Sequence, residues 1–200
     1  MLGRFMLKFR LGRVKIGVSI WFVSFFAIIF FVADNSALLY GLLAMACHEL
    51  GHLIVMMLCR CPIKRVSLLL GRLVIEPARR LRGKAEFPVL LGGVAANLLC
   101  ALLFALDGNM LACAVNLLIA AYNALPAHGL DGGGILQIAL CRRMMPSKAY
   151  KWQVAISFVL SFLLLAGGFL LLFRGYQNPT MLFAGIYIAA QNINSMRYTS

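Results

Sequence analysis

The sequence predicts a polytopic, mostly α-helical membrane protein (all-α in class) that carries short β-strands on its cytoplasmic side. Of its 200 residues, 62% are hydrophobic and only 12% are charged, and the mean hydropathy is +0.90. A soluble domain of this size carries about 25% charged residues. Six apolar runs are separated by short polar segments, and nearly all the basic residues lie in alternate segments. These observations favour a chain that crosses a bilayer repeatedly.

The first expected element is a strand that precedes the first apolar run. In "RFMLKFRLGRV" the apolar residues Phe5, Leu7 and Phe9 alternate with the basic residues Lys8 and Arg10. An alternation with period two is typical of a half-buried strand rather than of a helix.

Six membrane-spanning helices are expected next. A helix needs about 20 apolar residues to cross the hydrocarbon core of a bilayer. The first run is too long for the apolar region of a secretory signal, so we interpret it as an uncleaved helix. Polar residues at 191 and 192 interrupt the end of the sixth run, so the sequence leaves its completeness open. The runs are Ile16–Val32, Ala37–Leu58, Phe87–Leu106, Met110–Leu125, Val154–Phe173 and Thr180–Ile193.

The loop after the second run contains two further β-prone stretches. Val66–Leu70 and Leu73–Ile75 flank Gly71-Arg72, a pattern that favours a hairpin at the cytoplasmic membrane surface. An exposed edge of such a hairpin could accept an extended peptide as an added strand. An irregular basic loop is the alternative for the same residues.

The basic residues predict the orientation of the chain. They precede the first span, fill the loop after the second, and follow the fourth and sixth, and only Arg174 lies on the other side. The positive-inside rule therefore places the N-terminus in the cytoplasm. The net charge of +13 is explained by this topology and by contact with the anionic lipid bilayer, so no nucleic-acid partner is expected. Residues 1–200 are expected to form a single membrane domain.

The second span contains "HELGH", which is His48-Glu49-Leu50-Gly51-His52 and matches H-E-x-x-H. On a helix, residues four apart share a face, so both imidazoles can bind one ion. Glu49 could then take a proton from a water whose pKa zinc lowers to about 7. A polar cluster or proton relay, which also occurs inside membranes, is the alternative. Only three histidines and six acidic residues exist in the chain, and the motif uses three of them in order, which favours a metalloprotease.

A catalytic zinc site needs a third protein ligand. Asp131 is the favoured candidate, because Pro126 and the surrounding glycines break a helix near the cytoplasmic end of the fourth span. Broken helices at membrane depth are tolerated where they line a water-filled cavity. The full set of candidates is Asp34, Glu76, Glu86, Asp107, His128 and Asp131.

Together, "HELGH", "LDGG" and the preceding "NALP" resemble the motifs of the site-2 proteases, which are intramembrane zinc metalloproteases. The resemblance covers residues 37–140, where it implies a three-helix catalytic core. It implies that zinc, the expected cofactor, is bound by His48, His52 and Asp131, with Glu49 as the catalytic base.

The resemblance also suggests substrate-binding residues. The family's asparagine before the aspartate matches Asn123, and "GGVAAN" resembles a motif that makes Asn97 a second polar contact. Bonds to neighbouring helices are the alternative for both. Members often have proline where this chain has Gly129, and a bulkier residue where it has Gly134. His128 is read as a rim residue, with a pH-sensitive group or a competing ligand as alternatives.

One span before the core and two after it make the chain similar to the branch typified by the sporulation stage IV protease, which matures a membrane-associated pro-sigma factor. No PDZ or nucleotide-binding CBS domain is expected. The predicted function is intramembrane hydrolysis of peptide bonds in a membrane-embedded or membrane-associated protein near the cytoplasmic face of a bacterial cell membrane. An inhibitory membrane protein is a further candidate partner. The alternatives are a non-catalytic membrane platform and a small transporter with a buried polar cluster.

Overall fold

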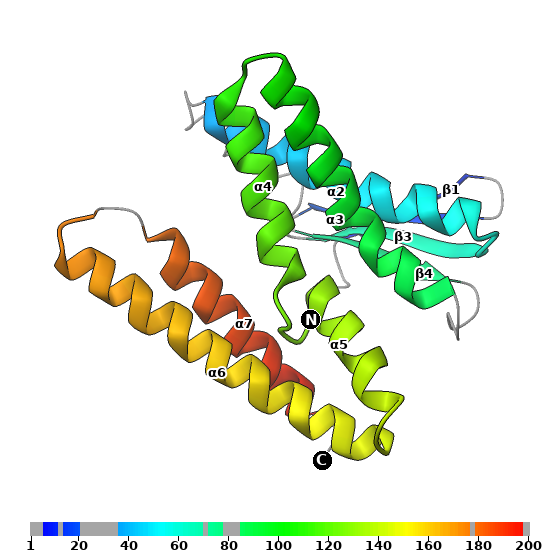
Figure 1. The fold of residues 1–200 in the computed structure, drawn as a ribbon. Helices are drawn as coiled ribbons and strands as arrows, with labels where there is room; N and C mark the ends of the chain where they lie inside the picture. The colour runs from blue at the N-terminus through cyan, green and yellow to red at the C-terminus, as the bar shows by residue number, and fades with distance from the viewer. Residues whose placement is uncertain are drawn as a thin grey trace. The chain divides into compact units, whose positions relative to one another are not determined.

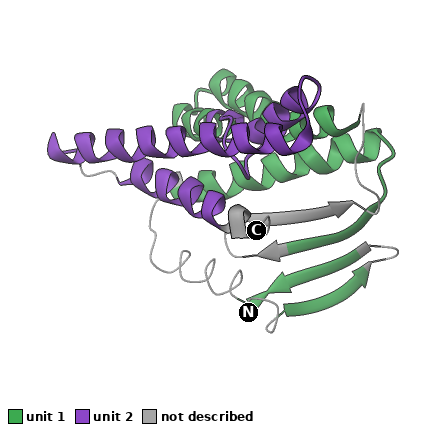
Figure 2. Cartoon of the chain, turned by 90° about the horizontal axis from the view of Figure 1, so that it is seen from below, with its two compact units in different colours: residues 1–120 green, residues 121–200 purple. Residues whose placement is uncertain are grey.

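The computed structural model describes residues 6–11, 14–20, 36–69, 72–77, 85–176 and 179–197. The chain divides into two compact units, residues 1–120 and 121–200, which Figure 2 shows in different colours. Helix α4, Met110–Ala124, begins in the first unit and ends in the second. The single-domain organisation expected from the sequence stays a prediction.

The first unit contains a four-stranded sheet in the order β1-β2-β3-β4 (Figure 1). Its outer pairs are antiparallel, and β2 pairs with β3 in parallel. The parallel pair requires a long crossover connection, and the chain between the two strands contains helix α2. The strands are β1 (Met6–Leu11), β2 (Val14–Ser19), β3 (Ile63–Leu69) and β4 (Arg72–Pro77).

Three of these strands confirm the sequence-based expectations. β1 lies within the alternating N-terminal stretch, and β3 with β4 forms the predicted hairpin, so the irregular loop is excluded. β2 corrects the expected first span, because Ile16–Ser19 belong to a strand rather than to the start of a helix. Most of the remainder of that predicted span, residues 21–32, lies outside the described residues.

Two long helices follow the expected spans in the first unit: α2 over Ser36–Leu58 and α3 over Glu86–Leu106. A tight turn connects α3 to α4, where Gly108 has a φ of +80°. Asn109 fixes this turn, because its Oδ1 accepts from the Ala112 amide at 3.1 Å and its Nδ2 donates to the Tyr40 hydroxyl at 2.7 Å.

The second unit contains α5 (Asp131–Cys141), α6 (Pro146–Phe173) and α7 (Thr180–Arg197). The short helix α5 begins at Asp131, after the break that Pro126 and the glycines predict. The core of the second unit contains Ala127, Leu130 and Ile188. Gly168 lets α7 approach α6, since a Cβ there would lie 2.7 Å from Leu182.

Among the described residues, three helical segments are long and apolar enough to cross a membrane: Leu38–Leu58, Glu86–Leu106 and Pro146–Phe173. α4 and the apolar part of α7, Thr180–Ile193, are shorter. Large apolar side chains are exposed on the helices, for example Leu102 at 57% and Phe162 at 68% exposure. The structure therefore supports a membrane protein, whereas the expected six spans stay a prediction.

Candidate metal centre

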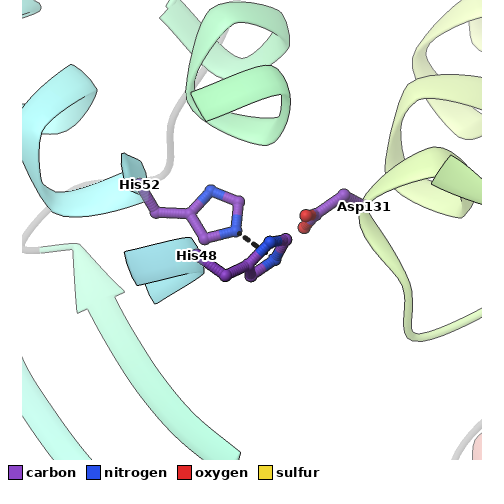
Figure 3. A group of neighbouring side chains, drawn as sticks. All are labelled: His48, His52 and Asp131. Carbon is purple, nitrogen blue, oxygen red and sulfur yellow. Dashed lines mark hydrogen bonds between the residues drawn. The ribbon is translucent and has the colours of Figure 1, made fainter. Parts of the chain in front are cut away.

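The H-E-x-x-H motif lies in the middle of α2, and the helix places both histidines on one face. The Nε2 atoms of His48 and His52 lie 3.2 Å apart (Figure 3), and their rings are nearly perpendicular at 88°. His48 is buried, with 6% of its surface exposed. Glu49 is half-buried and lies about 100° around the helix axis from His48.

Helix α3 holds each imidazole by its other nitrogen. The Nδ1 atom of His52 lies 2.7 Å from the Val89 carbonyl oxygen, and that of His48 lies 2.7 Å from Asn97 Oδ1. A carbonyl oxygen can only accept a hydrogen bond, so in each ring Nδ1 carries the proton and donates it. Such outer partners fix the tautomer of metal-binding histidines and leave Nε2 available to the metal.

Glycines allow this close approach of α3 to α2. A Cβ on Gly51 would collide with the Gly92 backbone, and a Cβ on Gly92 would lie 2.8 Å from the Gly51 carbonyl oxygen. The next residue, Gly93, faces both histidines, since a Cβ there would lie 2.5 Å from His52 Nε2. The backbones therefore meet at glycine, as is common where membrane helices pack closely.

The two histidines fit a bound metal ion. With Nδ1 as the donor in each ring, Nε2 is the nitrogen that can offer a lone pair to a metal, and the two Nε2 atoms lie 3.2 Å apart. One cation could therefore bind both nitrogens. Two nitrogen ligands of a tetrahedral zinc ion, each at 2.0–2.1 Å, lie about 3.3 Å apart. The observed separation of 3.2 Å agrees with that value.

In the second unit, Asp131 begins α5 and follows a sharp turn. α4 ends at Ala124 before Pro126, and Gly129 has a φ of +89°, in the region that favours glycine. Helix α6 holds this turn, because the Gln153 amide donates to the Gly133 carbonyl at 2.7 Å. The Ser157 hydroxyl also accepts from the backbone N–H of His128, at 3.0 Å. The predicted break of the helix before Asp131 is therefore confirmed.

His48 and His52 in the first unit and Asp131 in the second, the side chains drawn in Figure 3, carry donor atoms of the kinds that catalytic zinc takes. Of the other candidates, Asp107 is exposed at the turn between α3 and α4, and Glu86 is in the first turn of α3. Asp34 and the side chain of Glu76 lie outside the described residues.

The remaining sequence candidates have different surroundings. Asn97 is fully buried, and its side chain bonds to α2 and α4, which favours the alternative role given above for it. Asn123 is half-buried near the end of α4, and its substrate contact stays a prediction. His128 packs edge-on against the Tyr150 ring, with centroids 5.9 Å apart, and Nδ1 of His128 is buried with no hydrogen-bond partner among the described residues.

Sequence reasoning missed three residues that shape the site. Val89 acts through its backbone carbonyl, which no side-chain pattern reveals. Gly93 gives the space next to the two rings, and the pair of glycines in "GGVAAN" was the available signal. Asn116, 2% exposed, is a polar residue inside an apolar helix, and that isolation was the signal for it.

No protein-family model and no curated protein matches the sequence. Among solved structures, the fold is similar to that of the Site-2 Protease from Methanocaldococcus jannaschii, with a TM-score of 0.70 over 95% of this chain and 94% of that one. The sequences are 18% identical, so the likeness is one of fold. This fold agrees with the architecture that the sequence motifs imply.

Proposed function

We propose that this protein is a zinc metalloendopeptidase of the site-2 protease type that cleaves peptide bonds of a membrane-embedded or membrane-associated protein. The observation that carries the proposal is the pair of Nε2 atoms 3.2 Å apart, with both Nδ1 atoms bonded to oxygen acceptors. A metal ion would use both Nε2 atoms at once, at the spacing of two ligands of tetrahedral zinc.

Asp131 is proposed as the third ligand. Two imidazoles and one carboxylate are a common donor set of catalytic zinc, which keeps one further position open. Two features support this role. The Gln153 amide bonds to the first turn of α5, which carries the Asp131 carboxylate, and Gly129 adopts the positive φ of the sharp turn that precedes it. In this arrangement zinc would supply an activated water and Lewis-acid stabilisation of the developing oxyanion.

Glu49 is proposed as the general base. Its neighbour His48 is a ligand, and its own side chain projects to a different side of the helix, so it can reach a water beside the metal without binding the metal. The carboxylate would accept a proton from the attacking water and then deliver it to the nitrogen of the leaving amine. One proton is accepted and one is delivered, so the carboxylate is restored at the end of one cycle.

The membrane context defines the class of substrate. Three candidate spans and their exposed apolar faces support a protein in the bilayer, and the fold is that of a Site-2 protease. We propose a multi-pass topology with the N-terminus in the cytoplasm of a bacterial cell, and cleavage near the cytoplasmic face. A pro-sigma-type substrate with a sporulation role is the narrower form of the proposal and follows from the motif resemblance alone.

Zinc content of the detergent-purified protein tests this function. Wild type and Glu49→Gln are expected to carry nearly one zinc per chain, and Asp131→Ala much less. In liposomes with a transmembrane substrate, wild type should cleave and Glu49→Gln should not. Zinc retained in Asp131→Ala would contradict the role of Asp131 and point to His128. Absence of zinc from every variant would refute the metalloprotease and favour the polar cluster.

A further inference from the structure

A chain of hydrogen bonds leads from the ligand His48 through two buried asparagines to helix α4. Asn116, on α4, donates from Nδ2 to the Ala112 carbonyl at 2.9 Å. Its Oδ1 accepts from Nδ2 of Asn97, on α3, at 3.0 Å. Asn97 Oδ1 in turn faces Nδ1 of His48 at 2.7 Å. Asn116 therefore lies two hydrogen bonds from a ligand that it does not touch.

Backbone carbonyls fix the direction of every bond in this chain. The second proton of Asn97 Nδ2 goes to the Ala44 carbonyl at 2.8 Å. A backbone carbonyl oxygen only accepts, so the amide nitrogen of Asn97 must face Ala44 and that of Asn116 must face Ala112. Both protons of Asn97 are thus used, and its oxygen is the atom left for His48. The orientation of both amides follows from the network.

We propose that Asn116 is a positioning residue for zinc binding, which keeps His48 in the tautomer that presents Nε2 to the metal. Without the Asn116 acceptor, only the bond to the Ala44 carbonyl still holds the Asn97 amide in this orientation, so the flipped orientation gains population. A flipped Asn97 would aim Nδ2 at His48, whose Nδ1 would then have to accept. The ring proton would move to Nε2, and no lone pair would remain there for a metal. This inference rests on the proposed function.

A purely structural role is the competing explanation, because the same bonds join α2, α3 and α4. Asn109 offers a matched control on α4. It also bonds to α2, through the Tyr40 hydroxyl, and it caps the first turn of α4, but its side-chain hydrogen bonds go to Tyr40 and Ala112 rather than to Asn97 or His48. Its loss should weaken the helix packing without changing the tautomer of His48.

The first measurement is zinc affinity of full-length protein in detergent, by competition with a chelator. Loss of an outer partner of a ligand typically costs 10–100-fold in affinity. Asn97→Leu should fall in that range, and Asn116→Leu should bind about tenfold more weakly than wild type. Asn116→Asp should stay within about twofold of wild type, because a buried protonated carboxyl can accept from Asn97 and donate to the Ala112 carbonyl. Asn109→Ala should unfold at a lower temperature but bind zinc like wild type.

Asn116 borders a cavity of about 470 Å³ between α2, α3 and α4, which leaves room for the leucine side chain. A second readout distinguishes a change of tautomer from a steric effect. The ¹⁵N spectrum of imidazole in metal-free protein reports the tautomer directly, and the chain has three histidines. Wild type and Asn116→Asp should show His48 protonated on Nδ1, and Asn116→Leu should show a larger Nε2–H population.

The inference would be overturned by a zinc affinity of Asn116→Leu equal to that of wild type, or by a His48 tautomer unchanged in that variant. Equal weakening in Asn109→Ala would also overturn it, because the effect would then follow from helix packing. The proposed function fails separately, when wild type itself binds no zinc. In that case the tautomer measurement on metal-free protein still decides whether Asn116 orients His48.

Discussion

Replacing Gly93 by alanine should abolish tight zinc binding while leaving the helices folded. The added Cβ would lie 2.5 Å from His52 Nε2, 2.6 Å from His48 Cε1 and 2.7 Å from His48 Nε2. Real Cβ atoms essentially never approach closer than 3.0 Å, so the rings must move by about 0.5 Å at the least. Ligands of a metal site must be held within about 0.5 Å of their productive positions, so a shift of at least this size weakens binding.

Hydrogen bonds to α3 restrain both imidazole rings. Both Nδ1 atoms are held by 2.7 Å bonds to Asn97 and Val89, so a shift of the rings breaks bonds that orient them. We therefore expect zinc affinity to fall at least 100-fold in Gly93→Ala, the upper end of the range for losing one outer partner. Isothermal titration with zinc in detergent measures this directly.

Gly41→Ala is the matched control, because a Cβ at that position of α2 has no atom within 4 Å. Alanine is the better helix former by about 1 kcal/mol, so this variant should bind zinc normally and unfold at an equal or higher temperature. Wild-type affinity in Gly93→Ala would refute the reasoning, since it would mean that the ligand nitrogens do not lie next to this glycine.

Three further predictions concern the turn before α5 and the metal itself. Gly129→Pro introduces the residue that site-2 proteases often have at this position, and it should destabilise this chain by more than Gly129→Ala. Proline fixes φ near −65°, whereas the observed φ is +89°. Thermal unfolding of both variants checks this order, and a stabilised Gly129→Pro would contradict it. Gln153→Ala should cost about 1 kcal/mol of unfolding free energy, because the Gly133 carbonyl loses the donor from α6 and keeps only its bond within α5. Excess zinc at about 100 times its dissociation constant should stabilise the wild type by about 2.7 kcal/mol over the chelated protein, and His48→Ala should show no such difference.

The sequence predicted the elements whose signals are local. α2 and α3 follow from long apolar runs, and the motif in α2 follows from spacing alone, since positions 48 and 52 share a helix face in any context. The alternation in β1 and the turn residues between β3 and β4 are likewise contained in a few consecutive residues. Such patterns need no knowledge of the partner element.

The features that the sequence did not predict depend on partners far along the chain. "VKIGVS" is continuous with an apolar run, and only its parallel pairing with β3, some 50 residues later, distinguishes strand β2 from the start of a helix. The Asn97–Asn116 bond joins residues 19 apart on different helices. The role of Val89 involves only its backbone carbonyl. Each of these contacts is set by tertiary packing, which periodicity does not encode.

Polar groups inside an apolar helix bundle are tolerated when their hydrogen bonds are satisfied internally. Around His48 and His52 neutral groups provide these bonds. Nδ1 of His52 donates to the Val89 carbonyl and Nδ1 of His48 to Asn97, and the amides of Asn97 and Asn116 donate in turn to the carbonyls of Ala44 and Ala112. On the opposite side of the rings the two Nε2 atoms lie 3.2 Å apart, where one cation could bind both. Because the same hydrogen bonds join α2, α3 and α4, metal binding and the packing of these helices should be thermodynamically linked, each stabilising the other. The oxygen acceptors on the Nδ1 side orient both rings, and this preorganisation supports the proposal of a metal site at the pair of histidines.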